Sequence, residues 1–173
     1  MIIFIVVFGS CSPFPVNEII PTLQERLPGK TISSEVVKQD KLISGLKNHM
    51  YQLCILCTDP EDKSLFCQRF MQERLYISIS KDHPLAQAKS VTFHDLRGVR
   101  ILVNGNVGFW LDICKRNLNE ADLLIHGNPG ALTDLVESSN LPLFNSDQFI
   151  ARGFKTPGRI SIPISDTEAL VTY

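Results

Sequence analysis

The chain has 173 residues, of which 44% are hydrophobic and 20% are charged, as in an ordinary globular protein that is long enough to bury a core. Seventeen basic and eighteen acidic residues give a net charge of -1, which argues against nucleic-acid binding by this chain, because phosphate contacts require clustered cations. The five cysteines have the spacing of neither a disulfide scaffold nor a zinc site, and this predicts a reducing compartment, the cytoplasm.

An apolar run opens the chain at residues 1–8 and is followed by Gly9 and Ser10. The run is too short to span a bilayer, and it lacks the cationic start of a signal peptide. β-branched and aromatic residues that end at a Gly-Ser turn predict a buried parallel strand instead.

Helices and strands are then expected to alternate. Ser12 and Pro13 are typical of a helix start, and apolar residues at helical spacing predict one buried face after them. Thr31–Val37 is expected to form a strand, Asp40 to cap a second helix, and Tyr51–Cys57 to form a third strand. Strands and helices that alternate with short connections predict a parallel, doubly wound sheet.

A second alternation follows Leu75–Ser80, an extended stretch, and Thr92–Leu96, a short helical turn. Its expected elements, in chain order, are strand Arg100–Val103, helix Val107–Leu118, strand Asp122–His126, helix Gly130–Ser138, strand Leu141–Phe144, helix Asp147–Arg152 and extended segment Arg159–Ile164. The two series predict an α/β fold of two Rossmann-like lobes joined by two crossover strands.

The expected lobe boundaries follow from those crossings. The first lobe comprises residues 1–74 and 165–173, and the second comprises residues 80–158. Residues 75–79 and 159–164 are the expected hinge segments between them.

Ligands of open α/β sheets bind beyond the carboxyl ends of the strands, where helix N-termini present free N–H groups to anions. Three segments fall at such ends: Gly9–Pro13, Asn104–Phe109 and His126–Gly130. The candidate ligand-binding residues in them are Ser10, Cys11, Ser12, Asn104, Asn106, Phe109, His126 and Asn128. The alternative is that these serines and asparagines only cap helices and form turns.

Chemistry beyond binding is not indicated. The sequence assembles no nucleophile with a base, no metal cluster and no phosphate loop, so we predict no catalytic residue, no metal and no cofactor. Cys11 is predicted to be a core or capping thiol. Cys54 and Cys57 lie in an apolar, strand-like run, where positions three apart face opposite ways, and buried thiols are the better interpretation than a redox pair.

Three stretches resemble the central part of the effector-binding domains of LysR-type transcriptional regulators. These are Glu73–Ser80, the His-Pro-Leu-Ala step at His83–Ala86, and Val91–Gly98 with its Asp-Leu-x-Gly pattern. Leu42–Leu46 with Tyr51–Leu56 resembles the family's second helix and third strand, and Ile162–Asp166 resembles its return crossing. The similarity is spread over nearly the whole chain.

The resemblance implies a type 2 periplasmic-binding-protein-like fold, with a small-molecule effector bound between the lobes. It also implies that the loop at Ser10–Ser12 faces the loop at Asn104–Phe109 across a cleft. A homodimer or higher homo-oligomer is implied as well, formed side by side through helix Val16–Leu27 of one subunit and helix Val107–Leu118 of the other, with no membrane contact.

The chain departs from the family pattern in three places. The family's helix-turn-helix and linker helix are missing, so we expect a domain of a longer protein that contacts DNA only through that missing part. Glu137–Phe144 replaces the family's glycine-rich loop, and the chain stops at Tyr173, before the elements that normally complete the first lobe. An extracytoplasmic solute-binding protein of the same fold is the alternative function.

Overall fold

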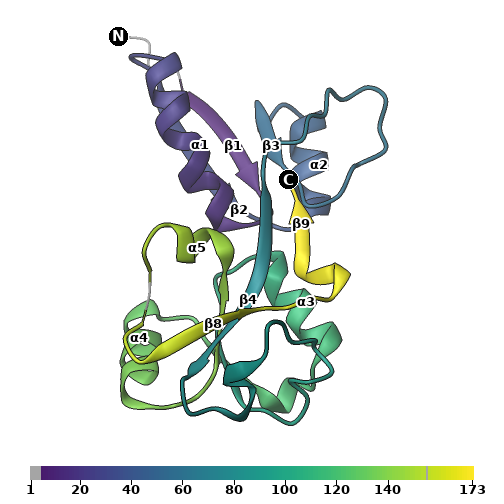
Figure 1. Cartoon of the computed structure of the whole chain (residues 1–173). Helices are drawn as coiled ribbons and strands as arrows, with labels where there is room; N and C mark the ends of the chain where they lie inside the picture. The colour runs from purple at the N-terminus through teal and green to yellow at the C-terminus, as the bar shows by residue number, and fades with distance from the viewer. Residues whose placement is uncertain (1–4, 155) are drawn as a thin grey trace. The chain divides into compact units, whose positions relative to one another are not determined.

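The computed structural model describes residues 5–154 and 156–173. The chain divides into two compact units (Figure 1): unit 1 consists of residues 1–71 with 172–173, and unit 2 consists of residues 72–171. The predicted bounds of the lobes and hinge segments stay predictions. The part of the predicted first strand that falls on residues 1–4 lies outside the described residues.

Unit 1 is built on a three-stranded parallel sheet of order β2-β1-β3, as the first alternation predicts. Its elements are β1 (Ile5–Ser10), α1 (Pro13–Arg26), β2 (Thr31–Val36), α2 (Gln39–Lys47) and β3 (Leu53–Ile55). The expected turn at Gly9 and Ser10 is wrong, because both residues stay in β1, where they pair with β2 and β3.

The caps of the two helices in unit 1 differ from expectation. α1 begins at Pro13 as predicted, but Ser12 gives no side-chain cap, and its carbonyl instead accepts a hydrogen bond from Ser10 Oγ at 2.6 Å. Asp40 does not cap α2; Lys38 holds that position and Asp40 lies in the first turn. The helix starts at Gln39, whose side-chain oxygen accepts a hydrogen bond from the Cys57 backbone N–H at 3.2 Å.

A buried tyrosine links the core of unit 1 to its edge strand. Tyr51 is 5% exposed and its hydroxyl donates a short hydrogen bond to Glu35 Oε1 on β2. The bond to the Glu35 carboxylate, with burial, raises the pKa of Tyr51 from 10.0 to about 12, because ionising the phenol removes the donated proton beside a negative charge.

The Tyr51 bond predicts a pH dependence. The folded pKa lies above the unfolded one, so the stabilisation is complete below pH 10 and is lost as pH rises towards 12. We expect the free energy of unfolding to fall more steeply between those values in the wild type than in Tyr51→Phe, which has no proton to lose. Urea unfolding followed by far-ultraviolet circular dichroism measures this. Parallel pH profiles of the two proteins would refute the assigned bond.

Unit 2 contains a mixed sheet of order β6-β5-β7-β4-β8, with β9 paired to β4. β5, β6 and β7 are parallel, whereas β4 runs antiparallel to β7 and β8. The strands are β4 (Gln72–Ser80), β5 (Ile101–Asn104), β6 (Leu123–His126), β7 (Leu143–Ser146), β8 (Arg159–Pro163) and β9 (Leu170–Thr172). The helices are α3 (Phe109–Asn117), α4 (Pro129–Ser138) and α5 (Asp147–Ala151).

The second alternation is therefore confirmed, with ends shifted by a few residues. The sequence analysis missed β9 and the short 3-10 helices Pro84–Gln87, Glu120–Asp122 and Thr167–Ala169. Each of these elements has only three or four residues, which is too few to show a hydrophobic period.

The side chains of strand β4 alternate between the two faces of the sheet in unit 2. Leu75, Ile77 and Ile79 are all at most 4% exposed and lie on one face of the sheet. The opposite face carries Leu102 of β5, which packs with Leu132 and Val136 of α4.

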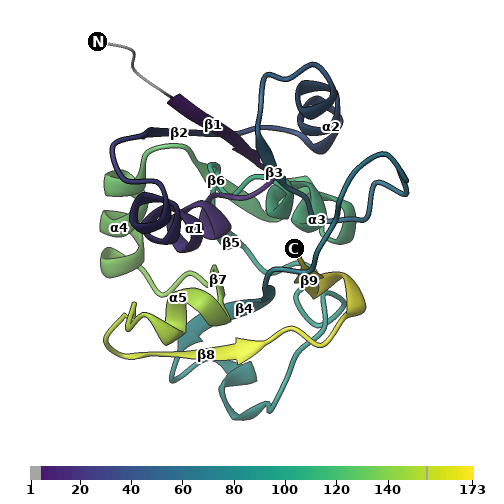
Figure 2. The same ribbon diagram turned by 90° about the horizontal axis from the view of Figure 1, so that it is seen from above.

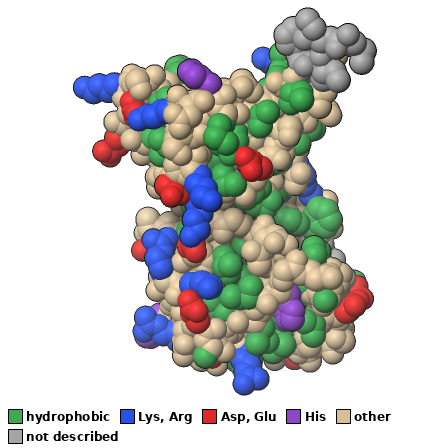
Figure 3. Space-filling model, turned by 180° about the vertical axis from the view of Figure 1, so that it is seen from behind, with side chains coloured by type: hydrophobic (Ala, Val, Ile, Leu, Met, Phe, Trp, Pro, Cys, Tyr) green, Lys and Arg blue, Asp and Glu red, His purple; other side chains and the backbone are tan. Residues whose placement is uncertain are grey.

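Across the described residues, no helix is long and apolar enough to cross a bilayer. On the face drawn in Figure 3, lysine and arginine side chains are interspersed with aspartate and glutamate.

Candidate functional site

In unit 1 the loop after β1 is buried and held by hydrogen bonds within the unit. Ser10, Cys11 and Ser12 are 0%, 2% and 1% exposed, and the Cys11 N–H donates to the Ile55 carbonyl at 3.0 Å. Because the Ser10 hydroxyl is already bonded to Ser12, the loop is a preformed connection between β1 and α1. The part of this loop that can most directly contact a ligand is the backbone at the start of α1.

In unit 2 the parallel pairing of β5 and β6 brings two candidate segments together. Asn104 lies directly beside His126 in the register, so the loops that follow the two strands are neighbours. Asn104 Oδ1 accepts from the Asn106 N–H at 2.9 Å, and Asn106 Nδ2 donates to the Gly127 carbonyl at 2.8 Å. The Asn106 side chain thus joins the two loops in one cluster, together with the Gly105 N–H, which donates to the His126 carbonyl at 2.8 Å.

Two helices begin at this cluster. Asn128 caps α4 by accepting from the N–H groups of Gly130 at 2.9 Å and Ala131 at 3.2 Å, which is the capping role weighed as the alternative to ligand contact. Phe109 is the first residue of α3, and the centroid of its ring lies 4.7 Å from the ring centroid of Trp110. The cluster therefore combines the capped start of α4 with the start of α3, which no side chain caps, and with one aromatic side chain, and the start of α3 is suited to an anion with an apolar body.

A buried hydrogen bond joins α3 to strand β4. Trp110 Nε1 donates to Glu73 Oε2 at 2.9 Å, and the two residues are 4% and 3% exposed. The sequence analysis did not single out Glu73. The available signal was its place two residues before Leu75 on the buried face of β4, where a carboxylate needs a buried donor.

Two of the five thiols are core groups. All five cysteines are free; Cys11 and Cys114 are buried, Cys67 is exposed, and Cys54 and Cys57, predicted to be buried, are only partly so. Burial raises the pKa of Cys54 to about 11 and that of Cys114 to about 12, so both thiols are protonated near neutral pH. Residues 5–154 and 156–173 contain no group of three or more histidine, cysteine, aspartate or glutamate side chains that could hold a metal ion.

The structure thus brings Asn104, Asn106, Phe109, His126 and Asn128 to one edge of unit 2, and the three candidates of unit 1 to the start of α1. That each of the eight residues contacts a ligand stays a prediction, as does the facing of the two loop sets.

Comparison with known protein families gives a clear match. The family model described as the LysR substrate binding domain matches residues 3–140. One curated relative, described as an uncharacterized HTH-type transcriptional regulator YybE of Bacillus subtilis strain 168, is 24% identical over 88 residues. That match covers 51% of this chain and 30% of the relative, so the chain corresponds to only part of such a regulator.

Solved structures of similar fold agree with that family. The reduced OxyR regulatory domain from Pseudomonas aeruginosa has a TM-score of 0.70 at 16% identity, covering 97% of this chain and 85% of that one. The BenM effector binding domain with its effector benzoate has a TM-score of 0.68 at 15% identity, over 99% and 82%. A full-length BenM variant has a TM-score of 0.73 at 15% identity, over 99% of this chain and 60% of that one.

Proposed function

Because this chain belongs to the family of LysR substrate-binding domains, we propose that it is the sensor of a transcription regulator and responds to a small anionic effector. The predicted type 2 periplasmic-binding-protein-like fold and the LysR identity are confirmed by the family match and the similar structures. The solute-binding alternative is not favoured, since the family and the curated relative are regulators.

The cluster at the carboxyl ends of β5 and β6 carries this proposal. Two helices start there: Asn128 caps the first N–H groups of α4, whereas no side chain caps α3, whose N-terminus carries partial positive charge. The loops Asn104–Phe109 and His126–Asn128 contain no lysine or arginine. An anion would therefore be selected by backbone dipoles and side-chain amides, with Phe109 contacting its apolar part.

We further propose that the Ser10–Ser12 loop supplies the other half of the site, as the resemblance implies. The effector then binds better to one relative position of the two units than to another, and that difference in affinity is what shifts the equilibrium. The signal passes to a DNA-binding part of a longer protein and through a homo-oligomer. Helices α1 and α3 are the proposed contacts of that oligomer.

A thermal-shift screen against small carboxylates, followed by titration of the best hit, tests the site. A ligand that binds only the folded state raises the melting temperature. We expect Asn106→Ala to weaken binding by about tenfold, a loss of about 1.4 kcal/mol, because it removes the side-chain hydrogen bond between the two loops and leaves only the backbone bond from Gly105 to His126. Asn140→Ala is the matched control, since Asn140 is exposed beyond α4. Equal affinities in the two variants would place the ligand elsewhere.

A further inference from the structure

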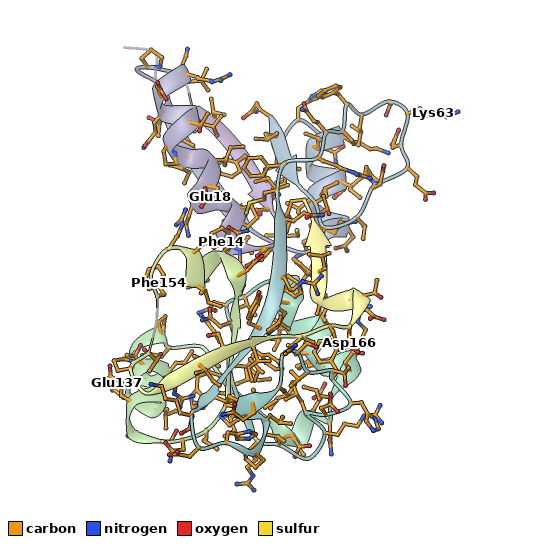
Figure 4. All side chains as sticks on the ribbon, in the orientation of Figure 1. Phe14, Glu18, Lys63, Glu137, Phe154 and Asp166 are labelled. Carbon is orange, nitrogen blue, oxygen red and sulfur yellow. The ribbon has the colours of Figure 1, made fainter. Side chains whose placement is uncertain are left out.

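A hollow lies within unit 2 and shares no residue with the candidate loops. Its volume is about 260 Å³. Its walls come from strands β4, β7 and β8 and from α5 with the segment after it. α5 lies over β4 and β7 (Figure 2), and Phe154 is in the connection between α5 and β8 (Figure 4).

The polar residues of this hollow project from one face of the sheet. Ser78 of β4 lies directly opposite Ser161 of β8, and Asn145 of β7 lies opposite Tyr76, two residues from Ser78. Arg159 is two residues from Ser161 along β8. Because residues opposite each other or two apart share a face, Ser78, Asn145, Arg159 and Ser161 form one polar group.

The Ser78 hydroxyl is the first sign of a ligand. Ser78 is only 4% exposed and lines the hollow, yet its Oγ makes no hydrogen bond within residues 5–154 and 156–173. In the described part of the chain no buried side-chain nitrogen or oxygen lacks a hydrogen-bond partner, so the Ser78 hydroxyl is reached from the hollow and is open to a ligand that enters it.

The Arg159 guanidinium is the second sign. Its Nη1 and Nη2 donate to four backbone carbonyls, and no carboxylate within the described part of the chain pairs with it. The C-terminus of α4 offsets part of its charge. Nε, the remaining donor, makes no hydrogen bond to a described residue. The hollow is thus lined by a cation that no described carboxylate neutralises and by a hydroxyl without a partner among the described residues.

Apolar side chains complete the hollow. Ile150, Phe154 and Ile160 line it, and Phe154 is 60% exposed with its ring 5.3 Å from that of Phe149. The volume lies just below the range of about 300–1,000 Å³ that is typical of small-molecule sites, and it suits a molecule of one ring. We propose that this hollow is a second ligand site, for a small carboxylate with an aromatic or branched apolar body.

Amide chemical shifts of the ¹⁵N-labelled chain test the proposal, with phenylacetate as the probe and phenylacetamide as its uncharged match. We expect phenylacetate to move the resonances of Ser78, Asn145, Thr156 and Ser161 with a dissociation constant on the order of 1 mM, as befits a ligand of this size. Phenylacetamide should bind at least about fivefold more weakly, because an amide carries no charge for Arg159.

Three variants locate the binding without disturbing Arg159. Ser161→Phe fills the hollow from an edge strand, where aromatic residues are accepted, and it should abolish the chemical-shift changes. Thr167→Phe is the control: Thr167 is exposed on a 3-10 helix, so the changes should remain. Ser78→Ala should weaken binding by about threefold or more, as the loss of one hydrogen bond does. The proposal is overturned if phenylacetate moves only resonances at Ser10–Ser12 or Asn104–Asn106, if nothing moves, or if Ser161→Phe binds as the wild type does.

Discussion

Replacing Arg159 with methionine is expected to lower the free energy of unfolding of unit 2 by about 3 kcal/mol, the largest effect of any single polar substitution considered. Arg159 Nη1 donates to the carbonyls of Leu141 at 2.8 Å and Ser78 at 3.3 Å. Nη2 donates to those of Ser139 at 2.8 Å and Val136 at 3.2 Å. Methionine keeps the length and packing of the side chain but provides no donor, so the four carbonyls lose their partner together.

The effect is large because Arg159 replaces a helix cap. α4 ends at Ser138 without the glycine that commonly follows a helix, and its last carbonyls need donors from elsewhere. Arg159 provides them from β8, and it therefore joins α4 to two strands. At the end of α4 it donates to the carbonyls of Val136 and Ser139.

Urea unfolding followed by the fluorescence of Trp110 measures the loss, because this single tryptophan is buried in unit 2. Arg97→Met is the matched control, since Arg97 is exposed and makes no side-chain hydrogen bond to a described residue. Arg159→Lys should recover part of the stability, because lysine keeps the charge but cannot span the four carbonyls. A loss below about 1 kcal/mol for Arg159→Met would show that water replaces the guanidinium at little cost.

The second large effect is expected at Gly9, where β1 packs against α2. A Cβ at this position would lie 2.3 Å from Leu42 Cδ2, and Leu42 is fully buried. Gly9→Ala should therefore lower the free energy of unfolding of unit 1 by about 2 kcal/mol, the usual cost of overpacking a core. Leu42→Ala should cost about 3 kcal/mol by leaving a cavity.

The double variant separates packing from backbone effects. In Leu42→Ala the clashing Cδ2 is gone, so adding Gly9→Ala should cost little, with a coupling of about 1–2 kcal/mol between the two sites. Amide hydrogen exchange in β1 and β3 gives the opening free energies of unit 1. Gly127→Ala is the control, because a Cβ there meets no atom within 4 Å. Strictly additive losses would mean that Gly9 is required for a reason other than its contact with Leu42.

The residues of the candidate site could be predicted from the sequence only as segments. Asn104 and His126 end two strand-like runs, and the rule that ligands bind beyond the carboxyl ends of parallel strands was enough to select both loops. The bonds between the loops, such as Asn106 to Gly127, depend on the register of β5 with β6, which separate runs of sequence do not specify.

The sequence by itself determined the alternation of helices and strands, and with it the α/β class. The apolar period in Leu75, Ile77 and Ile79 predicts β4, and the period in α4 places Leu132 and Val136 on one face, because these patterns act between near neighbours along the chain. The LysR resemblance arose from the same local stretches.

Only the tertiary structure decided which polar residues meet. Glu73 and Trp110 are 37 residues apart, and Arg159 reaches carbonyls 18 to 81 residues away. A hydrogen bond requires two atoms within about 3 Å, and its partner can come from any strand or helix end that the fold brings near. Local sequence patterns specify elements, whereas these contacts exist only once the sheet order β6-β5-β7-β4-β8 has set which elements are neighbours.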